Sequence, residues 1–300
     1  SLPAKPAQMA ANSFPRRVLK KALFPLFGTQ LYILIQAISK ASDIRRGIWT
    51  EPELDLVPLA VLPGETALDL GANFGLYSYH IGRAVGDQGH VFAFEPVPFT
   101  YDTLSLVAKL LRLHNVTIIN KACGNTSGQV CLHVPIQPSG AISAGPAHLS
   151  TRNDDRMGKD SQVRWNQVGT VEANIVKLDE ALPAISTLSL IKADIEGYEY
   201  FAFQGAEEII DRHFPTIICE INPWYLEGFN VNSEDFFDFL FRKNYQLFSY
   251  SSDQQLLPIT PDNIVEDNYV FIHPSRLGRF TSMRNTEFLP HPEVGGATSE

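Results

Sequence analysis

The chain has 300 residues, of which 44% are hydrophobic, and this allows one large domain with a substantial core and a smaller appendage. Its formal net charge of -9 at pH 7 excludes a general attraction to phosphate backbones, so we expect no nucleic acid partner. The three cysteines, Cys123, Cys131 and Cys219, show no C-x-x-C spacing, which predicts reduced thiols in a cytoplasmic protein.

Residues 1–50 form a predicted N-terminal extension with a disordered start. After this start, which is rich in Ala and Pro, an apolar stretch at 22–38 is expected to be helical. We expect it to pack on the core or to form a homodimer with a second copy. Pro25, Gly28 and Gln30 interrupt the stretch, which falls short of a bilayer span, so no transmembrane segment is predicted. Contact with a membrane surface is the alternative, because basic residues precede the stretch.

A strand followed by a glycine loop is the most informative part of the sequence. Residues 66–70 form an apolar run that suits a central parallel strand, with Asp69 near its end. Gly71 and Gly75 then allow a tight turn into a helix predicted at 76–85. Since open α/β sheets bind ligands at the carboxyl ends of their strands, we expect this loop to bind a nucleoside-bearing cofactor.

A second predicted strand, at 90–95, ends in Glu95 and is stopped by Pro96. Glu95 lies 24 positions after Gly71, close to the interval of roughly 20 at which a strand-end carboxylate binds ribose hydroxyls. The loop pattern is G-x-x-x-G and lacks the middle glycine that lets a pyrophosphate approach. S-adenosylmethionine has no pyrophosphate and carries a cationic sulfonium, so it suits Asp69 better than a dinucleotide does.

An insertion at 125–176 interrupts the predicted domain. Residues 129–134 and 171–177 alternate in hydrophobicity, which predicts a hairpin. Between them, residues 136–170 follow no pattern, and a long insertion of this kind is typically a lid or a binding loop. We expect it to contact the acceptor; a solvated loop is the alternative.

A strand at 188–194 precedes a helix predicted at 198–213. Asp194 and Glu196 lie two positions apart at the strand end, and an extended backbone would point both side chains to one side. They are the candidate general bases, with Asp194 alternatively holding the methionine part of the cofactor. His148 is a weaker candidate.

A divalent metal is a further alternative at this edge of the sheet. Glu220 and Asn222 follow the next predicted strand, at 216–222, and together with Asp194 they offer oxygen ligands to Mg²⁺ or Ca²⁺. Strand-end acids and amides are also common without any ion, so the metal is the less favoured interpretation.

These motifs together resemble the FkbM-type methyltransferase family, over roughly residues 66–250 and in the family's order. The resembling segments are 68–75, 94–96, 122–124, 177–180, 191–199, 205–206 and 218–221. The resemblance implies a class I methyltransferase: an α/β, Rossmann-like domain at 51–275 with seven strands, mostly parallel, and a peripheral tail at 276–300. It implies cofactor contacts from Asp69, Gly71, Ala72, Asn73, Phe74, Gly75, Glu95, Pro96, Ala122, Cys123 and Asp194.

The predicted function is therefore S-adenosylmethionine-dependent O-methylation of a hydroxyl on a small molecule or glycan. A nicotinamide-dependent oxidoreductase is one alternative, disfavoured because the middle glycine of the loop is missing. A non-catalytic module that has kept the fold is the other. The acidic and glycine residues of the predicted site are all present, which argues against that degenerate module.

Overall fold

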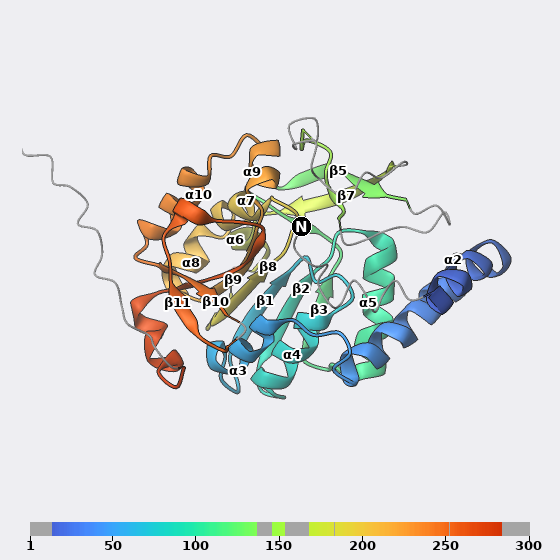
Figure 1. The fold of residues 1–300 in the computed structure, drawn as a ribbon, viewed down its shortest axis with the longest axis horizontal. Coiled ribbons are helices and arrows are strands. Elements are labelled where there is room, and N and C mark those ends of the chain that lie inside the picture. Colours follow the sequence, from blue (N-terminus) through green and yellow to red (C-terminus); the bar gives the residue numbers. More distant parts are fainter. Residues whose placement is uncertain (1–13, 137–145, 154–167, 183, 252, 284–300) are drawn as a thin grey trace, which may run out of the picture.

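The computed structural model describes residues 14–136, 146–153, 168–182, 184–251 and 253–283, without the side chains of 14–28 and 263. Eight strands form the main sheet, in the order β11-β10-β12-β9-β8-β1-β2-β3 (Figure 1). The five from β3 to β9 in this order are parallel, and β12 is antiparallel to both of its neighbours. The strands are β1 (Thr66–Leu70), β2 (His90–Phe94), β3 (Val116–Ile119), β8 (Leu190–Ala193), β9 (Thr216–Ile221), β10 (Gln246–Tyr250), β11 (Leu256–Pro258) and β12 (Asp267–Ile272).

This topology confirms the predicted class I methyltransferase fold, a mostly parallel sheet with a late antiparallel strand. The main sheet has one strand more than the seven expected, because the short β11 pairs with β10 at the edge. The sequence around β11 has too few residues of strand type to predict it.

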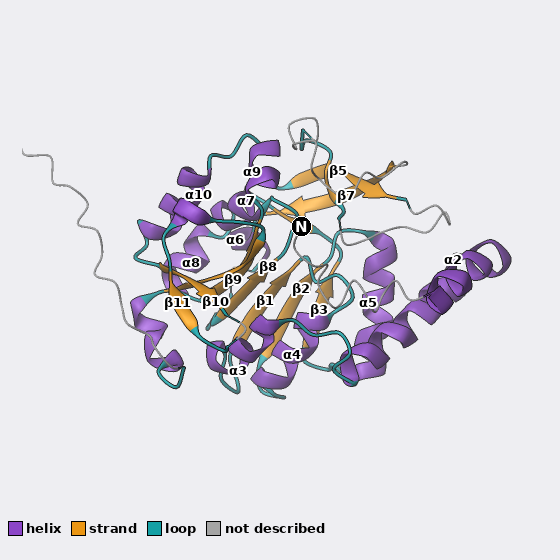
Figure 2. Ribbon diagram, in the orientation of Figure 1, coloured by secondary structure: helices purple, strands orange, loops and turns teal. Residues whose placement is uncertain are grey.

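Helices cover both faces of the main sheet (Figure 2). Successive side chains of a strand point to opposite faces, so Ala67 packs in one core with α3 and α4 while Leu68 packs in the other with α7, α8 and α10. The helices are α3 (Val57–Ala60), α4 (Leu76–Val85), α5 (Pro98–Leu111), α6 (Leu178–Ala181), α7 (Glu199–Gln204), α8 (Glu207–His213), α9 (Pro223–Gly228) and α10 (Ser233–Phe241), with 3-10 turns η1 (Pro52–Leu56) and η3 (Pro261–Asn263).

The helix predicted at 198–213 is two helices, α7 and α8, which meet at Gly205. A side chain at Gly205 would clash with the carbonyl oxygen of Gly124, so the backbone of the second sheet approaches closely here. The break in the helix is where that contact is made.

A second sheet, in the order β4-β7-β5-β6, contains the predicted hairpin. β5 (Gly128–Pro135) and β7 (Val168–Val176) pair antiparallel, as expected. The strand predicted at 116–122 ends earlier, at Ile119; β4 (Ala122–Cys123) pairs instead with β7, and β6 (His148–Leu149) pairs with β5. Most of the unpatterned stretch, 137–145 and 154–167, lies outside the described residues.

The N-terminal helix α2 (Phe14–Arg45) continues through Pro25, Gly28 and Gln30, which we expected to interrupt it. It packs against α5, where Tyr32 stacks on Phe99 with ring centroids 5.7 Å apart. Among the helices that the structure describes, none is long and apolar enough to cross a membrane. The homodimer through this helix stays a prediction; among the side chains of residues 29–45, the exposed large apolar ones are Leu31, Leu34 and Ile38.

The start of the predicted peripheral tail is part of the core. The turn η4 (Pro274–Phe280) buries Phe280 completely. Arg279 forms a two-pronged ion pair with Glu65, at 2.7 and 2.6 Å, and this interaction holds the pKa of Glu65 at about 2 against the opposing effect of burial. The interpretation of the tail as peripheral is therefore wrong for these residues.

Candidate active site

The loop after β1 is held tightly at the carboxyl ends of β2 and β8. The backbone N–H groups of Gly71 and Ala72 both donate to the Phe94 carbonyl, at 3.0 and 2.9 Å. Gly71 has a φ of 76°, and a Cβ there would clash with the carbonyl oxygen of Asp194. Only glycine therefore lets the loop lie directly against the end of β8.

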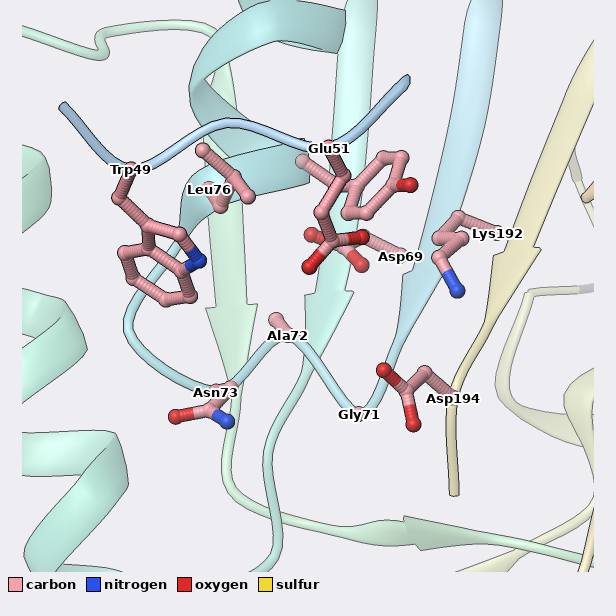
Figure 3. Close-up of a pocket in the computed structure, with 10 residues that line it drawn as sticks. Trp49, Glu51, Asp69, Gly71, Ala72, Asn73, Leu76, Lys192 and Asp194 are labelled. Atoms are coloured by element: carbon pink, nitrogen blue, oxygen red, sulfur yellow. The ribbon is translucent and has the colours of Figure 1, made fainter. Parts of the chain in front are cut away.

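A pocket opens between this loop, the end of β8 and a segment that precedes the sheet. Figure 3 shows the carboxylates of Glu51 and Asp194 and the ammonium of Lys192 directed into the same space, with Trp49 at its side. The pocket thus combines acidic, basic and aromatic groups. Its lining is Trp49, Glu51, Asp69, Gly71, Ala72, Asn73, Leu76, Tyr77, Lys192 and Asp194.

Asp69 lies buried at the floor of this pocket. Its carboxylate accepts a hydrogen bond of 2.5 Å from the Ser78 hydroxyl, which comes from the first turn of α4. Burial raises the pKa of Asp69 to about 6; the negative charge of Asp194 adds to the rise, while Ser78 and Lys192 oppose it. Asp69 is therefore ionised at neutral pH and becomes neutral in mild acid.

Lys192 places a positive charge in the same pocket. Its Nζ donates to the Ala193 carbonyl at 3.2 Å and to Asn268 Oδ1 at 3.0 Å, and it lies 4.8 Å from the ring centroid of Tyr77. Burial lowers the pKa of this ammonium, but nearby carboxylates, Asp194 foremost, raise it further, and the net shift is upward. Lys192 is therefore protonated at neutral pH.

Two buried polar atoms at the pocket are unsatisfied. Asn73 Oδ1 and the Tyr77 hydroxyl lie outside strict hydrogen-bonding geometry with every residue in the described part of the chain, although Glu51 lies close enough to add to the effect of burial in raising the pKa of Tyr77. Leaving such groups unpaired in a buried site costs about 1–3 kcal/mol each. The pocket therefore suits a ligand that hydrogen-bonds to both.

Glu95 supports the loop rather than lining the pocket. Its carboxylate accepts hydrogen bonds from the backbone N–H groups of Asn73, at 3.0 Å, and Val97, at 2.9 Å. Burial raises its pKa to about 8, although these two hydrogen bonds favour the charged form. Its contact with ribose hydroxyls stays a prediction.

Asp194 and Glu196 converge, but not in the predicted way. Strand β8 ends at Ala193, and Glu196, with a φ of 58°, and Gly197, with a φ of 97°, form a turn instead of an extended segment. Carboxylate oxygens of Asp194, Glu196 and Glu220 lie within 4.8 Å of one another. The turn thus builds an acidic cluster next to the pocket.

Asn222, the third member of the expected metal set, caps a helix. Its side-chain oxygen accepts from the backbone N–H groups of Trp224, at 3.0 Å, and Tyr225, at 3.3 Å, and so caps the N-terminus of α9. Asp194 and Glu220 of the expected metal set lie together, and Glu196 is the third carboxylate beside them. A metal at these carboxylates stays a prediction.

Arg152, in the turn after β6, contacts the acidic cluster, and His148 of β6 lies behind it. Arg152 Nη1 donates to the Glu196 carbonyl at 3.1 Å, and its guanidinium lies 4.4 Å from the ring centroid of Tyr225. Arg152 Nη2 lies 2.8 Å from Nδ1 of the buried His148. Burial and the charge of Asp194 raise the pKa of Glu196, with Arg152 opposing them.

Five predicted cofactor residues line the pocket, and the other six do not. Asp69, Gly71, Ala72, Asn73 and Asp194 are brought together. Those outside the lining are Phe74 and Gly75 in the loop, Glu95 and Pro96 after β2, and Ala122 and Cys123, which are buried in β4 of the second sheet.

Sequence reasoning missed half of the lining. Lys192 left a signal, because a lysine inside an apolar strand of four residues is unusual. Trp49 and Glu51 gave no sequence signal, since they follow the N-terminal helix and belong to no recognisable motif. Lys40 of α2 contacts Trp49, with its Nζ 4.1 Å from the ring centroid, and Phe74 of the loop, at 4.9 Å. The remaining residues that were missed are Leu76 and Tyr77.

Comparison with known proteins identifies the family. Residues 69–247, more than half of the chain, match the family model described as the methyltransferase FkbM domain. The chain belongs to the FkbM methyltransferase family. The resemblance seen in the sequence is thereby confirmed, and Trp49 and Glu51 of this FkbM chain lie before the matched range.

The chain is similar to two named relatives and to one solved structure. Methyltransferase sdnD of Sordaria araneosa is 28% identical over 192 residues, 57% of this chain and 72% of the relative. Methyltransferase 1 of Beauveria bassiana (strain ARSEF 2860) is 24% identical over 187 residues, 58% of this chain and 69% of the relative. The crystal structure of Methyltransferase FkbM from Methylobacillus flagellatus KT has 18% identity and a TM-score of 0.43. Its alignment covers 74% of this chain and only half (50%) of that one.

Proposed function

We propose that the chain is an S-adenosylmethionine-dependent methyltransferase that methylates a hydroxyl oxygen of a small molecule or glycan. The observation that carries this proposal is the pocket at the carboxyl ends of β1 and β8, where an FkbM chain gathers carboxylates beside unsatisfied buried polar atoms. The donor is cationic at its sulfonium and its amino group, and Asp69 offers it negative charge. Asn73 Oδ1 offers a hydrogen-bond acceptor.

Methyl transfer requires that the protein position the acceptor oxygen against the methyl group and that it provide a general base. Bound S-adenosylmethionine supplies a methyl group that the acceptor oxygen takes, while the electrons of the broken C–S bond stay on sulfur. Asp194 lies where the pocket meets the acidic cluster, so its carboxylate accepts the acceptor's proton. Glu196, whose pKa is raised, is suited to hold that proton at neutral pH.

The acidic cluster and Arg152 support a hydroxyl-bearing acceptor. Carboxylates accept hydrogen bonds from hydroxyl groups, and a guanidinium donates to hydroxyl oxygens. The net charge of -9 disfavours nucleic acid. No step of the proposal needs the divalent metal. The cytoplasmic location stays a prediction, with the three free cysteines in its support.

Calorimetry tests the proposed cofactor. S-adenosylhomocysteine should bind, and NAD should not, because the G-x-x-x-G loop offers no approach to a pyrophosphate. Binding of NAD alone would make the chain an oxidoreductase. A methyl-transfer assay on extracted small molecules then separates an enzyme from a binding module, and persistent inactivity with intact cofactor binding would favour the module.

A further inference from the structure

Lys40 of α2 is a cation that contacts two aromatic rings. Its Nζ lies 4.1 Å from the centroid of the Trp49 ring and 4.9 Å from that of the Phe74 ring. Both distances are within the roughly 6 Å at which a ring face attracts a cation. Trp49 lies before β1, and Phe74 lies in the glycine loop, residues 71–75, that follows it. Lys40 therefore joins two segments that border the pocket, although it does not line the pocket itself.

The packing of α2 determines where the Lys40 side chain lies. Ala37, Ala41 and Ile44 form a buried stripe on this helix and pack in the core that contains α3 and α4. Lys40 comes three positions after Ala37 and four before Ile44, so it lies beside this stripe. Since the stripe is fixed in the core, Lys40 reaches the two rings only while α2 is packed in place.

The backbone fixes Trp49 only in part. Its N–H donates to the Asp43 carbonyl at 3.3 Å, which places the main chain but does not by itself set the two dihedrals of the side chain. The Trp49 ring is half-buried and packs against buried residues of the cores on both faces of the sheet. A cation over its face favours one orientation, with the ring at the side of the pocket as in Figure 3.

The Phe74 ring is the contact of Lys40 on the glycine loop. It is 9% exposed and packs in the core on the side of α7, α8 and α10. The preceding residue, Asn73, lines the pocket, and its N–H donates to the Glu95 carboxylate at 3.0 Å. The loop is thus held by Glu95 from within the domain and by Lys40 from α2. A displacement of Lys40 would affect both borders of the pocket at once.

The charge of Lys40 distinguishes this contact from ordinary packing. An aliphatic side chain would also fill the space beside two rings, but only a cation is attracted to the faces of both. This attraction holds Trp49 and the glycine loop at a fixed spacing, and the pocket lies between them. Because Lys40 does not line the pocket, its effect on a ligand acts through the two rings.

We propose that Lys40 is a positioning residue of the cofactor site, which holds Trp49 and the glycine loop at the spacing that S-adenosylmethionine requires. This inference rests on the proposed function and deepens it. It makes the packing of α2 a condition for tight cofactor binding. It also places a determinant of affinity in a helix that precedes the family match at 69–247.

Calorimetry with S-adenosylhomocysteine measures the effect of removing the charge. Lys40→Met keeps an apolar side chain of similar length but loses the cation, so affinity should fall about 3- to 10-fold. Lys40→Arg keeps a cation that stacks on aromatic rings, and its affinity should stay within about twofold of the unmodified protein. Lys109→Met, at an exposed lysine of α5, is the matched control and should leave the affinity unchanged.

A double-mutant cycle separates positioning from a general loss of stability. If Lys40 acts through Trp49, Lys40→Met should cause less than about a twofold further loss in the Trp49→Ala background. A merely structural effect of Lys40 would recur there in full. Trp165→Phe and Trp224→Phe together leave Trp49 as the only tryptophan. In that chain, Lys40→Met should loosen the Trp49 ring and increase the quenching of its fluorescence by acrylamide.

Phe74→Leu breaks the contact from the loop side and decides the question if Lys40→Met does not fold. It should weaken S-adenosylhomocysteine by about 3- to 10-fold as well. Unchanged affinity in whichever of these variants folds, or an equal loss from Lys40→Met with and without Trp49, overturns the inference while the proposed function stands. If the unmodified protein binds no S-adenosylhomocysteine, the proposed function fails, and the role of Lys40 fails with it.

Discussion

The two walls of the pocket are built in different ways. Gly71, Ala72 and Asn73 follow β1 inside the family match; the N–H groups of Gly71 and Ala72 donate to the Phe94 carbonyl, and that of Asn73 donates to the Glu95 carboxylate. Trp49 lies 20 positions before the match begins and is held by contacts with α2. The strand-end wall, formed by Gly71, Ala72, Asn73 and Asp194, therefore depends on local sequence. The N-terminal wall, formed by Trp49 and Glu51, depends on how α2 packs against the domain.

The backbone explains how α2 positions the second wall. The Asp43 carbonyl, near the end of α2, accepts from the N–H groups of Ile48, at 2.9 Å, and Trp49, at 3.3 Å, and so turns the chain back toward the sheet. Lys40 then lies over the Trp49 ring. A pocket shared by a family can thus be completed by a segment that the family pattern does not include.

The strand-end wall contains Asp194, the proposed general base, so substitution of Asp194 should give the largest effect. Asp194→Asn should lower the rate constant of methyl transfer by about 10²- to 10⁴-fold, the usual contribution of a general base, and change cofactor affinity far less. Single-turnover kinetics and calorimetry measure the two. Asp235→Asn, at an exposed acid of α10, is the matched control. Equal losses in rate and affinity would assign Asp194 to binding instead.

The next effect should come from the turn in the same wall. Gly71→Ala would force a Cβ into the Asp194 carbonyl at a positive φ, so it should lower the free energy of unfolding by about 2–5 kcal/mol. Gly47→Ala is the control, because Gly47 also has a positive φ, 64°, but no atom near its Cβ. It should cost about 1 kcal/mol. Equal losses in denaturant unfolding would show that the close approach to β8 does not matter.

The N-terminal wall should give a smaller effect, confined to binding. Trp49→Ala removes an aromatic side of the pocket and should weaken S-adenosylhomocysteine by about 10- to 30-fold in calorimetry. Trp224→Ala, at a tryptophan that is 51% exposed, should leave the affinity unchanged. Unchanged affinity in Trp49→Ala would mean that the family domain alone makes the site.

The smallest predicted effect is a pH dependence from Asp69. Its pKa of about 6 means that acid neutralises a carboxylate facing the cationic end of the ligand, so affinity should fall as pH drops through 6, up to about tenfold by pH 5. The folding stability of the ligand-free protein depends on pH in the opposite direction to the affinity. The raised pKa makes the folded protein hold a proton that the unfolded chain releases near 3.8, so this group's stabilising contribution is lost as pH rises toward 6. An affinity profile equally steep in Asp69→Asn would assign the titration elsewhere.

The same contrast explains what the sequence could predict. Strands β1 and β2, the turn at Gly71 and the hairpin of β5 and β7 follow from local periodicity and from glycine's conformational freedom, and the structure contains them. The extra strand β11 and the break at Gly205 depend on contacts between distant segments, which no local pattern records.

The residues of the candidate site also fall into those that local sequence predicts and those that it does not. Asp69 and Asp194 could be placed because strand ends of a parallel sheet meet at one edge. Asn222 could not be, since its side chain is used to cap α9. Glu51 could not be either, because α2 and the turn after it bring it to the pocket from outside the domain pattern.

A crystal structure of the protein with S-adenosylhomocysteine tests the central claim most directly, namely that both walls together hold the methyl donor. We predict that the ligand lies in the pocket with its cationic end facing the Asp69 carboxylate and with Trp49 in contact. A ligand bound elsewhere, or held by the strand-end wall with Trp49 and Glu51 turned away, would contradict the account.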